Sequence, residues 1–470
     1  MAGSKSGKGP VNNLNDLDYK TWLRFQKSFD RYEFGTGQYP TDFENIVREY
    51  IRFFTKKAYE SGPAVILTNI RGIGDIDGRT ITMVEDPFSS KVLNSFHEIN
   101  PASVDYVILQ VHRLNEKDPS DTNNLLSSIA NALKPSAYAT IFCHEISDPY
   151  PYIWSFASSC RKSLNLCDEK LLLDEKKDNL PVYALQFRKE EDLLPKKEFR
   201  HEIKVAKILT SPQYIIPRPP PRKKEEFKHP AKFPEELIEE LILSFTDEDD
   251  WVLDVMAGTG STLVAAYKKN RNGVGIELCQ EFYNIAKERI NKANPPVRLP
   301  GFECPYKSEL IKGDARNVDT LLEEKKGQIR YCITSPPYWS MLHNPGSEGQ
   351  RERRGKGLKL TYSESEEDLG NIHNYNQFIS TLKTIYENVA PLLTADGKLT
   401  VIVKNVKRNG SLYTLAWDLV DELAGPDGKY DYIGYTLWCQ DDTGLKPFAI
   451  GHHWVSNILH QYCLHFSVRR

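Results

Sequence analysis

The sequence predicts an α/β fold in which helices wind both faces of a mostly parallel sheet. Short apolar segments alternate with amphipathic helical patterns between residues 237 and 466, as in chains built from βαβ units. A glycine-rich turn follows the apolar segment 251–254 and precedes a helical run, which is where open α/β sheets bind nucleotides. A weaker copy of the alternating pattern occurs in the first half of the chain.

Composition sets the broad class of the protein. The chain of 470 residues is long enough for two or three domains with cores of their own. A hydrophobic content of 40% and a charged content of 27% are typical of soluble proteins. No apolar run approaches membrane-spanning length, and residues 1–15 do not resemble a signal peptide. The eight cysteines form no CxxC pair, so we expect reduced thiols in a cytoplasmic protein and no metal site.

The glycine turn is the first candidate site. The predicted strand 251–254 leads into Gly258 and Gly260, which let the backbone turn tightly and approach a ligand. The next predicted strand ends at Glu277, close to the spacing at which a ribose-binding acid follows such a turn. Leu263 replaces the third glycine of the dinucleotide fingerprint, and no Gly-Lys-Ser/Thr follows. The turn therefore fits neither a dinucleotide site nor a phosphate loop.

The second candidate site is the turn 334–339, Thr-Ser-Pro-Pro-Tyr-Trp, which follows the apolar strand 329–333. Its two prolines remove two backbone donors and stiffen the turn, so that its carbonyl groups remain free to accept hydrogen bonds. Ser335 adds a short polar group, and Tyr338 adds a flat apolar face. Such a turn suits a planar ring that carries an exocyclic amine. Taken alone, the segment is equally compatible with a proline-stiffened surface turn.

Together, these segments resemble the S-adenosylmethionine-dependent DNA amino-methyltransferases, which act on N4 of cytosine or N6 of adenine. The resemblance extends from Phe227 to the C-terminus and implies a Rossmann-like methyltransferase fold, with S-adenosylmethionine as cofactor and duplex DNA as substrate. The chain departs from the family's usual Asp-Pro-Phe by having Val255 and Met256. The resemblance implies cofactor contacts by His229, Lys232, Phe233, Asp254, Met256, Gly258, Thr259, Gly260, Ser261, Thr262, Glu277 and Asp314.

The resemblance also implies that Ser335, Pro336, Pro337 and Tyr338 form the catalytic turn. An exocyclic amine is a weak nucleophile because its lone pair is delocalised into the ring. Hydrogen bonds to Ser335 and to the Pro336 carbonyl would localise that lone pair for direct attack on the sulfonium methyl group, after the base has left the duplex and stacked on Tyr338. In this family a serine at the first position favours cytosine N4, and an aspartate or asparagine favours adenine N6. Ser335 therefore predicts cytosine N4.

Local charge indicates where DNA would bind, because the net charge of −3 does not predict a nucleic-acid partner. The basic loop 351–359 follows the catalytic turn, and positive groups there would neutralise phosphates. A solvated charged loop with no DNA contact is the alternative. The residues that we expect to contact DNA are Trp339, Arg351, Arg353, Arg354 and Lys356.

The internal repeat predicts the role of the first half. The segment 103–112 occupies the same place in the pattern as 329–339, and 125–142 corresponds to 378–403. The first copy has Leu109-Gln110-Val111-His112 where the second has Ser335 to Tyr338, so it lacks the acceptor pair and the stacking ring. We therefore expect a catalytically inactive half-domain that serves recognition, dimerisation or support, formed from a tandem copy that lost its glycine motif.

The predicted domain order follows from these assignments. A disordered tail is expected at 1–17, the degenerate methyltransferase-like half-domain at 18–195 and a basic proline-rich linker at 196–228. The catalytic domain follows at 229–470, with its cofactor half at 229–314 and its catalytic half at 329–466. In many serine-type members the catalytic half comes first, and the repeat explains the different order found here.

Three alternatives remain open at this point. They are adenine N6 methylation by the same fold, methylation of an RNA base, and a DNA-binding protein without catalysis. The sequence is also compatible with a homodimer, and with a cognate restriction or defence partner. We expect a cytoplasmic protein associated with the nucleoid.

Overall fold

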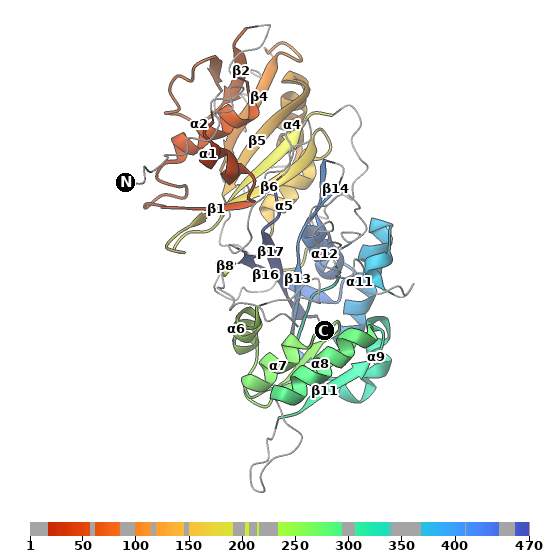
Figure 1. The fold of residues 1–470 in the computed structure, drawn as a ribbon. Helices are drawn as coiled ribbons and strands as arrows, with labels where there is room; N and C mark the ends of the chain where they lie inside the picture. The colour runs from red at the N-terminus through yellow and green to blue at the C-terminus, as the bar shows by residue number, and fades with distance from the viewer. Residues whose placement is uncertain are drawn as a thin grey trace, which may run out of the picture. The chain divides into compact units, whose positions relative to one another are not determined.

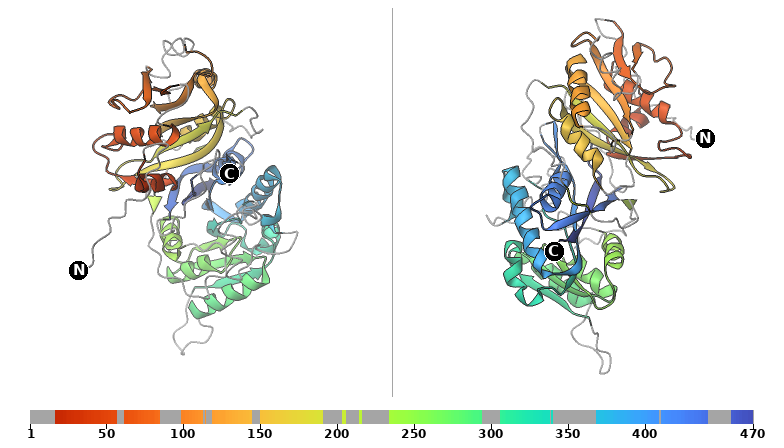
Figure 2. Two further views of the ribbon diagram at one scale, coloured as in Figure 1. Left: turned by 45° about the horizontal axis from the view of Figure 1, so that its top comes forward. Right: turned by 180° about the vertical axis from the view of Figure 1, so that it is seen from behind.

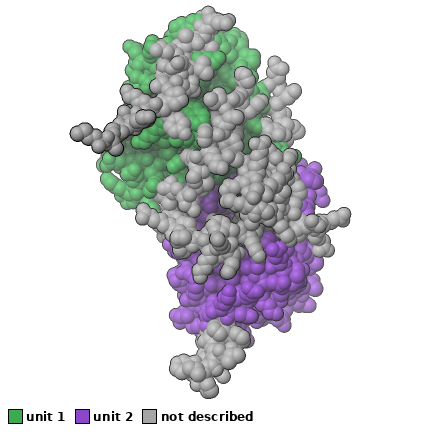
Figure 3. Space-filling model, in the orientation of Figure 1, with its two compact units in different colours: residues 1–201, 407–413, 443–459 green, residues 202–406, 414–442, 460–470 purple. Residues whose placement is uncertain are grey.

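The computed structural model describes residues 17–56, 62–84, 99–112, 114, 119–144, 150–190, 203–205, 214–215, 234–293, 306–337, 339, 368–408, 410–440 and 456–469. The chain forms two compact units (Figure 3). Unit 1 comprises 1–201, 407–413 and 443–459, and unit 2 comprises 202–406, 414–442 and 460–470. Two short segments of the predicted catalytic domain therefore belong to the first unit. Among the described residues, no helix is long and apolar enough to cross a membrane.

Unit 1 is built on a seven-stranded sheet with the order β1-β6-β7-β5-β4-β2-β3 (Figure 1). Strand β7 runs antiparallel to β5 and β6, and the other pairs are parallel. Helices α1 and α2 lie on one face of this sheet, and α4 and α5 on the other (Figure 2). The elements are α1 (Tyr19–Phe25), β1 (Phe29–Tyr32), α2 (Phe43–Phe54), β2 (Ala64–Thr68), β3 (Arg79–Met83), β4 (Val104–Val111), α4 (Pro119–Ala132), β5 (Leu133–His144), α5 (Tyr152–Cys160), β6 (Asn165–Asp174) and β7 (Val182–Arg188).

Unit 2 is built on an eight-stranded sheet with the order β11-β10-β9-β12-β13-β17-β16-β8. Strand β17 is antiparallel to both of its neighbours, and the other pairs are parallel. The helices are α6 (Glu235–Phe245), α7 (Ser261–Lys268), α8 (Gln280–Ala293), α9 (Val318–Leu321), α11 (Tyr375–Val389) and α12 (Leu415–Ala424). The strands are β8 (Tyr214–Ile215), β9 (Trp251–Asp254), β10 (Asn272–Glu277), β11 (Ser308–Lys312), β12 (Ile329–Thr334), β13 (Leu393–Val403), β16 (Tyr430–Cys439) and β17 (His460–Val468).

The core of unit 2 explains why its strands are apolar runs rather than alternating ones. Parallel strands covered by helices on both faces must bury both sets of side chains. In α6, Leu237, Leu241 and Ile242 recur at helical spacing and pack on Val252, Tyr331 and other side chains of the sheet. Burying each such side chain stabilises the fold by about 1.5–3 kcal/mol.

The two sheets have the same topology. Reading β3-β2-β4-β5-β7-β6-β1 against β10-β9-β12-β13-β17-β16-β8 pairs each strand of the seven-stranded sheet with a strand of the eight-stranded sheet, which has β11 in addition. The predicted α/β fold with a degenerate copy of related topology is confirmed. The copy is a whole sheet rather than a catalytic half, because β2 and β3 are the counterparts of the cofactor-side strands β9 and β10.

Interior contacts repeat between the units as well. The Tyr106 hydroxyl lies 2.6 Å from Thr140 Oγ1, and the Tyr331 hydroxyl lies 2.7 Å from Thr400 Oγ1. All four side chains are buried, and the pairs join β4 to β5 in unit 1 and β12 to β13 in unit 2. These hydrogen bonds fix which residues of the two units are equivalent.

A second repeated contact anchors helix α2 in unit 1 and helix α6 in unit 2. Arg79 Nε donates to Thr55 Oγ1 at 3.2 Å in unit 1, and Arg271 Nε donates to Thr246 Oγ1 at 2.9 Å in unit 2. Each arginine also donates to the carbonyl oxygen of the same threonine, at 3.1 and 2.7 Å. The contact ties the end of α2 or α6 to the start of β3 or β10.

The equivalence corrects the predicted alignment of the repeat. Ile108 pairs with Thr140, and Ile333 pairs with Thr400, so Gln110 is the counterpart of Ser335. The sequence pattern alone aligns Leu109 with Ser335, which is one position too early. The sequence of one strand does not by itself define its register with the next strand. Apolar residues surround both candidate positions, Leu109 and Gln110.

The glycine motif of the first copy is also present, contrary to the prediction that it was lost. Gly72 and Gly74 follow β2 by the same four and six residues by which Gly258 and Gly260 follow β9, and all four have positive φ. What unit 1 lacks is the helix: residues 69–78 join β2 directly to β3, where α7 intervenes in unit 2.

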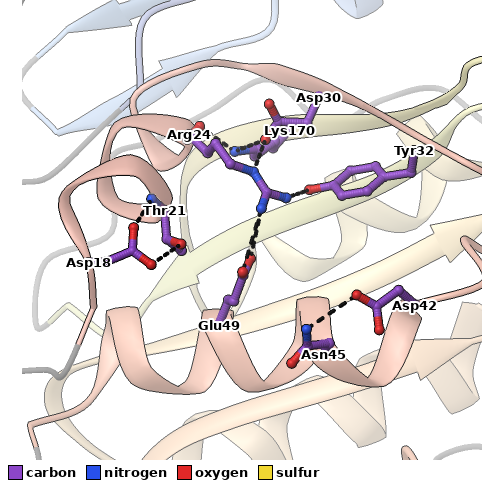
Figure 4. A network of polar contacts seen from close by, with 9 residues as sticks. All are labelled: Asp18, Thr21, Arg24, Asp30, Tyr32, Asp42, Asn45, Glu49 and Lys170. Atoms are coloured by element: carbon purple, nitrogen blue, oxygen red, sulfur yellow. Dashed lines mark hydrogen bonds and ion pairs between the residues drawn. The ribbon is translucent and has the colours of Figure 1, made fainter. Parts of the chain in front are cut away.

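Charged groups hold the edge of the sheet in unit 1 (Figure 4). Arg24 donates to the Tyr32 hydroxyl at 2.6 Å and lies 3.4 Å from Glu49. Lys170 Nζ lies 3.0 Å from Asp30 Oδ2 and also donates to the Arg24 carbonyl oxygen at 2.7 Å. Burial lowers the pKa of Lys170 and raises that of Glu49. The network joins α1, β1, α2 and β6.

Polar contacts within unit 1 also fix the short sheet of β14 (Val406–Arg408) and β15 (Ser411–Tyr413). Lys407 forms an ion pair with Asp168, which is fully buried in β6. The Asp168 carboxylate also accepts a hydrogen bond from Ser456 N at 2.7 Å. Ser411 Oγ donates to Asn165 Oδ1 at 3.0 Å. A buried carboxylate needs such partners. Asp168 therefore favours attachment to β6 of two C-terminal segments, the one with Lys407 and the one with Ser456.

Candidate active site

The candidate site lies at the carboxyl edge of the unit 2 sheet. Strands β9 and β12 are parallel neighbours, so the glycine turn and the catalytic turn begin at the same edge. The last residues of these strands, Asp254 and Thr334, are joined by a hydrogen bond of 2.9 Å from the threonine hydroxyl to Asp254 Oδ1. The two motifs, 80 residues apart in the chain, are therefore in direct contact.

Asp254 organises both turns. Besides Thr334, its Oδ1 accepts a hydrogen bond from Met256 N at 3.1 Å, and its Oδ2 accepts one from the Thr262 hydroxyl at 2.6 Å. Burial raises the pKa of Asp254, and these three donors oppose the rise. The structure therefore gives Asp254 and Thr262 a positioning role: their side chains hold the glycine turn to the strand and to the first turn of α7.

The glycine turn adopts the conformation for which its glycines are suited. Gly258 and Gly260 have φ of 53° and 77°, in the left-handed region that side chains disfavour. A Cβ on Gly260 would lie 3.0 Å from the Ala286 Cβ of α8, so the turn also packs closely on its neighbour. Helix α7 starts at Ser261, directly after the turn, and its first backbone N–H groups face the edge where a ligand would lie.

Glu277 ends β10 beside this turn. Its Oε2 accepts a hydrogen bond from Gly258 N at 2.8 Å, and its Oε1 accepts one from Cys279 N at 2.7 Å. Burial raises the pKa of Glu277 to about 7, against the lowering effect of those two hydrogen bonds. A carboxylate has about four acceptor positions, so both oxygens can still accept hydrogen bonds from ribose hydroxyl groups. The residues present therefore fit an adenosine-containing cofactor.

Asp314 follows β11, the strand beyond β10. Its side chain accepts hydrogen bonds from Arg316 N at 2.9 Å and from Arg316 Nε at 2.8 Å. Asp254 and Glu277 end β9 and β10, and Asp314 follows β11, so the three acids lie at one edge of three adjacent parallel strands.

The turn predicted to be catalytic leaves β12 at Thr334, which is 2% exposed. Ser335 and Pro337 are half-buried, and Pro336 is buried. Trp339 is 3% exposed and packs edge-on against Tyr375, with ring centroids 4.9 Å apart. Its position favours a role in holding the turn, and its contact with DNA stays a prediction.

Several predicted site residues lie outside the described residues. They are His229, Lys232, Phe233, Tyr338, Arg351, Arg353, Arg354 and Lys356. The described members Met256, Gly258, Thr259, Gly260, Ser261 and Thr262 all belong to the turn after β9 or to the start of α7. Within the described part of the chain, no group of three or more His, Cys, Asp or Glu side chains is arranged to hold a metal ion.

Two residues at this edge were not among the predicted site residues. Thr334 is part of the predicted turn 334–339, but the sequence assigns no role to its hydroxyl, because its partner Asp254 lies 80 residues away. Lys404 follows β13, three positions beyond the residue that pairs with Thr334. Burial lowers the pKa of Lys404 to about 8.

The sequence profile of the DNA methylase family, N6_N4_Mtase, matches residues 12–288, which is more than half of the chain. The chain belongs to this S-adenosylmethionine-dependent family. The match begins in unit 1 and ends in α8, so it extends the resemblance, which the motifs placed from Phe227 onward, into the first unit. The catalytic turn 334–339 lies beyond the matched range.

Individual relatives match over short segments. The Type II methyltransferase M2.LlaDCHI of Lactococcus lactis subsp. cremoris is 43% identical over 65 residues, which are 14% of this chain and 24% of that protein. The orphan methyltransferase M.BamHII of Bacillus amyloliquefaciens is 45% identical over 64 residues, again 14% and 24%. The chain thus spans about a quarter of the length of these relatives.

Among solved structures, the T. thermophilus 16S rRNA N2 G1207 methyltransferase (RsmC), in complex with AdoMet and guanosine, is similar with a TM-score of 0.27 and 15% identity. The similarity covers 88% of this chain and 90% of that one.

Proposed function

We propose that this protein transfers a methyl group from S-adenosylmethionine to N4 of cytosine in duplex DNA. The proposal rests on the hydrogen bond from Thr334 to Asp254, because it joins the Ser335 turn to the glycine turn. A methyl donor at one turn and a flipped base at the other would then be neighbours. Membership in the DNA methylase family supports the same reaction class.

The cofactor would be held by the glycine turn and by the acids beside it. Backbone N–H groups at the start of α7 suit the carboxylate of its methionine moiety, and Glu277 suits its ribose hydroxyls. Asp314 is proposed to contact the adenine side. When bound, S-adenosylmethionine supplies an electrophilic methyl group.

The chain's own contribution to the chemistry is to prepare the amine. The Ser335 hydroxyl and the Pro336 carbonyl would accept hydrogen bonds from the exocyclic NH2, which localises its lone pair in the direction of attack. Tyr338 would stack on the base after it leaves the duplex. The new N–C bond would replace the C–S bond of the donor, and the methylated amine would release one proton to solvent.

Unit 1 is proposed to be catalytically inactive and to act in recognition, dimerisation or support. Gln110 and Val111 take the places of Ser335 and Pro336, and no helix follows the glycines of its turn. This leaves one reaction centre in each chain.

DNA binding is proposed for the basic residues Arg351, Arg353, Arg354 and Lys356, whose contacts with phosphates would make affinity depend on salt. Two of the relatives are named as type II and orphan methyltransferases, which supports a role in modification with or without a cognate restriction enzyme. Such a role would place the protein at the nucleoid, in the cytoplasm.

The double variant Ser335→Ala with Tyr338→Ala tests the proposal. We expect DNA methylation to fall by at least about 10³-fold, since both amine and base lose their partners, with S-adenosylmethionine affinity unchanged in calorimetry. The matched control is Gln110→Ala in unit 1, which should leave activity unchanged. Wild-type activity in the double variant would refute the assignment of the turn.

Mass spectrometry of digested nucleic acid separates the alternatives. N4-methylcytosine in DNA supports the proposal. N6-methyladenine would show instead that the target is adenine N6, the other target of the family. Labelled methyl in RNA and not in DNA would identify an RNA enzyme. A wild-type chain that binds no S-adenosylmethionine would leave only the non-catalytic alternative.

A further inference from the structure

An arginine supports the glycine turn of unit 2 from α8. Arg289 Nη1 lies 2.5 Å from the Thr259 carbonyl oxygen, 2.9 Å from Thr259 Oγ1 and 3.2 Å from Ser261 Oγ. Thr259 stands between the two left-handed glycines, so this guanidinium contacts the centre of the turn. The Arg289 side chain is 18% exposed. Its hydrogen bonds are therefore partly protected from water.

The other end of the guanidinium ties the turn to a second segment. Arg289 Nη2 lies 2.5 Å from Glu235 Oε1, at the first residue of α6, and Lys268 Nζ of α7 lies 2.7 Å from Glu235 Oε2. Helix α6 directly follows the segment 229–233, from which the resemblance implies cofactor contacts. The arginine thus links the glycine turn to the helix next to that segment.

The turn needs such support because of its composition. Glycine loses more conformational freedom on ordering than any other residue, and this turn has one on each side of Thr259. A turn that is not held would have to be ordered when the ligand binds, and that cost would weaken the affinity. Hydrogen bonds from a charged donor are about twice as strong as neutral ones, which suits an arginine to the task.

Unit 1 holds its own glycine turn in the same way with a different helix. Arg48 of α2 donates to the carbonyl oxygen of Ile73, which stands between Gly72 and Gly74 as Thr259 stands between Gly258 and Gly260. The donor comes from α2 in one unit and from α8 in the other. The same carbonyl is therefore bound by arginine in both units, although the two arginines are not equivalent residues.

We propose that Arg289 is a positioning residue of the cofactor site, which holds the turn 258–260 in its binding conformation without touching the reacting atoms. The proposal rests on the proposed function, because the site that it prepares is that of S-adenosylmethionine. Arg48 holds a turn to which no cofactor is assigned. It therefore offers a control within the same chain.

The test compares Arg289→Met with Arg48→Met in the full-length protein. For Arg289→Met we expect the calorimetric Kd for S-adenosylmethionine and its KM to rise about tenfold, while kcat at saturating cofactor stays within about twofold. Arg48→Met should leave Kd, KM and kcat unchanged. Arg289→Lys keeps one charged donor and should recover most of the affinity.

Hydrogen exchange provides a measurement that does not depend on cofactor. Amides of residues 255–262 should exchange faster in Arg289→Met than in the wild type, in the absence of any ligand. Thermal unfolding checks that each variant is folded. If Arg289→Met does not fold, Glu235→Gln replaces it in the test, because this variant weakens the ion pair but keeps the arginine. It should raise Kd by a smaller factor.

The outcomes separate the two levels of the proposal. Unchanged Kd and unchanged exchange in Arg289→Met would overturn the positioning role while leaving the methyltransferase proposal intact. An equal rise in Kd for Arg48→Met and Arg289→Met would show a general loss of stability and would also overturn it. A wild type that binds no S-adenosylmethionine overturns the proposed function, and the exchange rates then still decide whether Arg289 holds the turn.

Discussion

The two units differ at the carboxyl edge of the sheet and agree in its interior. Thr68 Oγ1 accepts a hydrogen bond from Ile70 N at 3.1 Å, as Asp254 Oδ1 accepts one from Met256 N at 3.1 Å. A hydroxyl is thus sufficient to hold the start of the turn. The geometry of the turn and its chemistry are therefore separable requirements.

The link between the two turns is where the units diverge. In unit 2 one carboxylate joins the turn after β9 to the residue before Ser335. In unit 1 the Asn69 side chain bonds the backbone of Gln110 twice, with Gln110 N to Oδ1 and Nδ2 to Gln110 O both at 2.8 Å. The Asn69 amide thus occupies both the backbone donor and the backbone acceptor of Gln110, the counterpart of Ser335. The backbone of this residue in unit 1 is therefore not free to bind a ligand. Its counterpart in unit 2 lies next to the proposed site of the amine.

The largest difference should follow from removing Asp254. Asp254→Ala leaves the hydroxyls of Thr262 and Thr334 and the amide of Met256 without their acceptor, so both turns lose their anchor. We expect methylation to fall by at least about 10²-fold and the free energy of unfolding to fall by about 2–4 kcal/mol. Thr68→Ala, its counterpart, should cost about 1 kcal/mol and leave activity intact. Equal activity in the two variants would contradict the distinction between the units.

A smaller effect is expected from the clamps that both units share. Arg79→Met and Arg271→Met each remove a buried guanidinium that bonds a threonine hydroxyl and carbonyl. Each should lower the free energy of unfolding by about 2–3 kcal/mol, measured by denaturant titration. If only one variant is destabilised, the two clamps are not equivalent, and the contact in the other unit is incidental.

The smallest effect is a pH dependence that Glu277 of unit 2 should produce. The ionised form of Glu277 is the better acceptor for ribose hydroxyls, and its pKa of about 7 means that much of it is neutral at lower pH. Affinity for S-adenosylmethionine should therefore rise about tenfold from about pH 6 to about pH 8, and Glu277→Gln should abolish that dependence. A pH-independent Kd in the wild type would exclude Glu277 from cofactor binding.

Stability should change in the opposite direction. Because the folded state raises the pKa of Glu277 above its ordinary value of 4.5, the folded state binds this proton more tightly than the unfolded state does. The wild type should therefore lose stability relative to Glu277→Gln as pH rises from about 4.5 to about 7, and the difference should be constant above that range. Denaturant titrations of both proteins across this range provide the measurement.

Much of the site could be predicted because its residues act through the backbone or through strand ends. Gly258 and Gly260 are recognisable in sequence since few other residues accept positive φ. Glu277 and Asp314 are recognisable since one acid ends a strand and the other follows one. The α/β fold follows from apolar runs that only a sheet covered on both faces can bury. The roles of Thr334 and Arg289 could not be predicted in this way. Their partners are 80 and 30 residues away, and nothing local distinguishes them from other polar residues.

Local backbone preferences and hydrophobic period are sufficient to predict the nucleotide-type glycine turn, the proline-stiffened turn and the repeated α/β pattern. The extent of the repeat, the equivalence of Gln110 and Ser335, and the contact of Asp254 with both turns become visible in the folded chain. Register and side-chain pairing depend on which strands become neighbours. That choice is made by packing across the whole sheet rather than by any one segment.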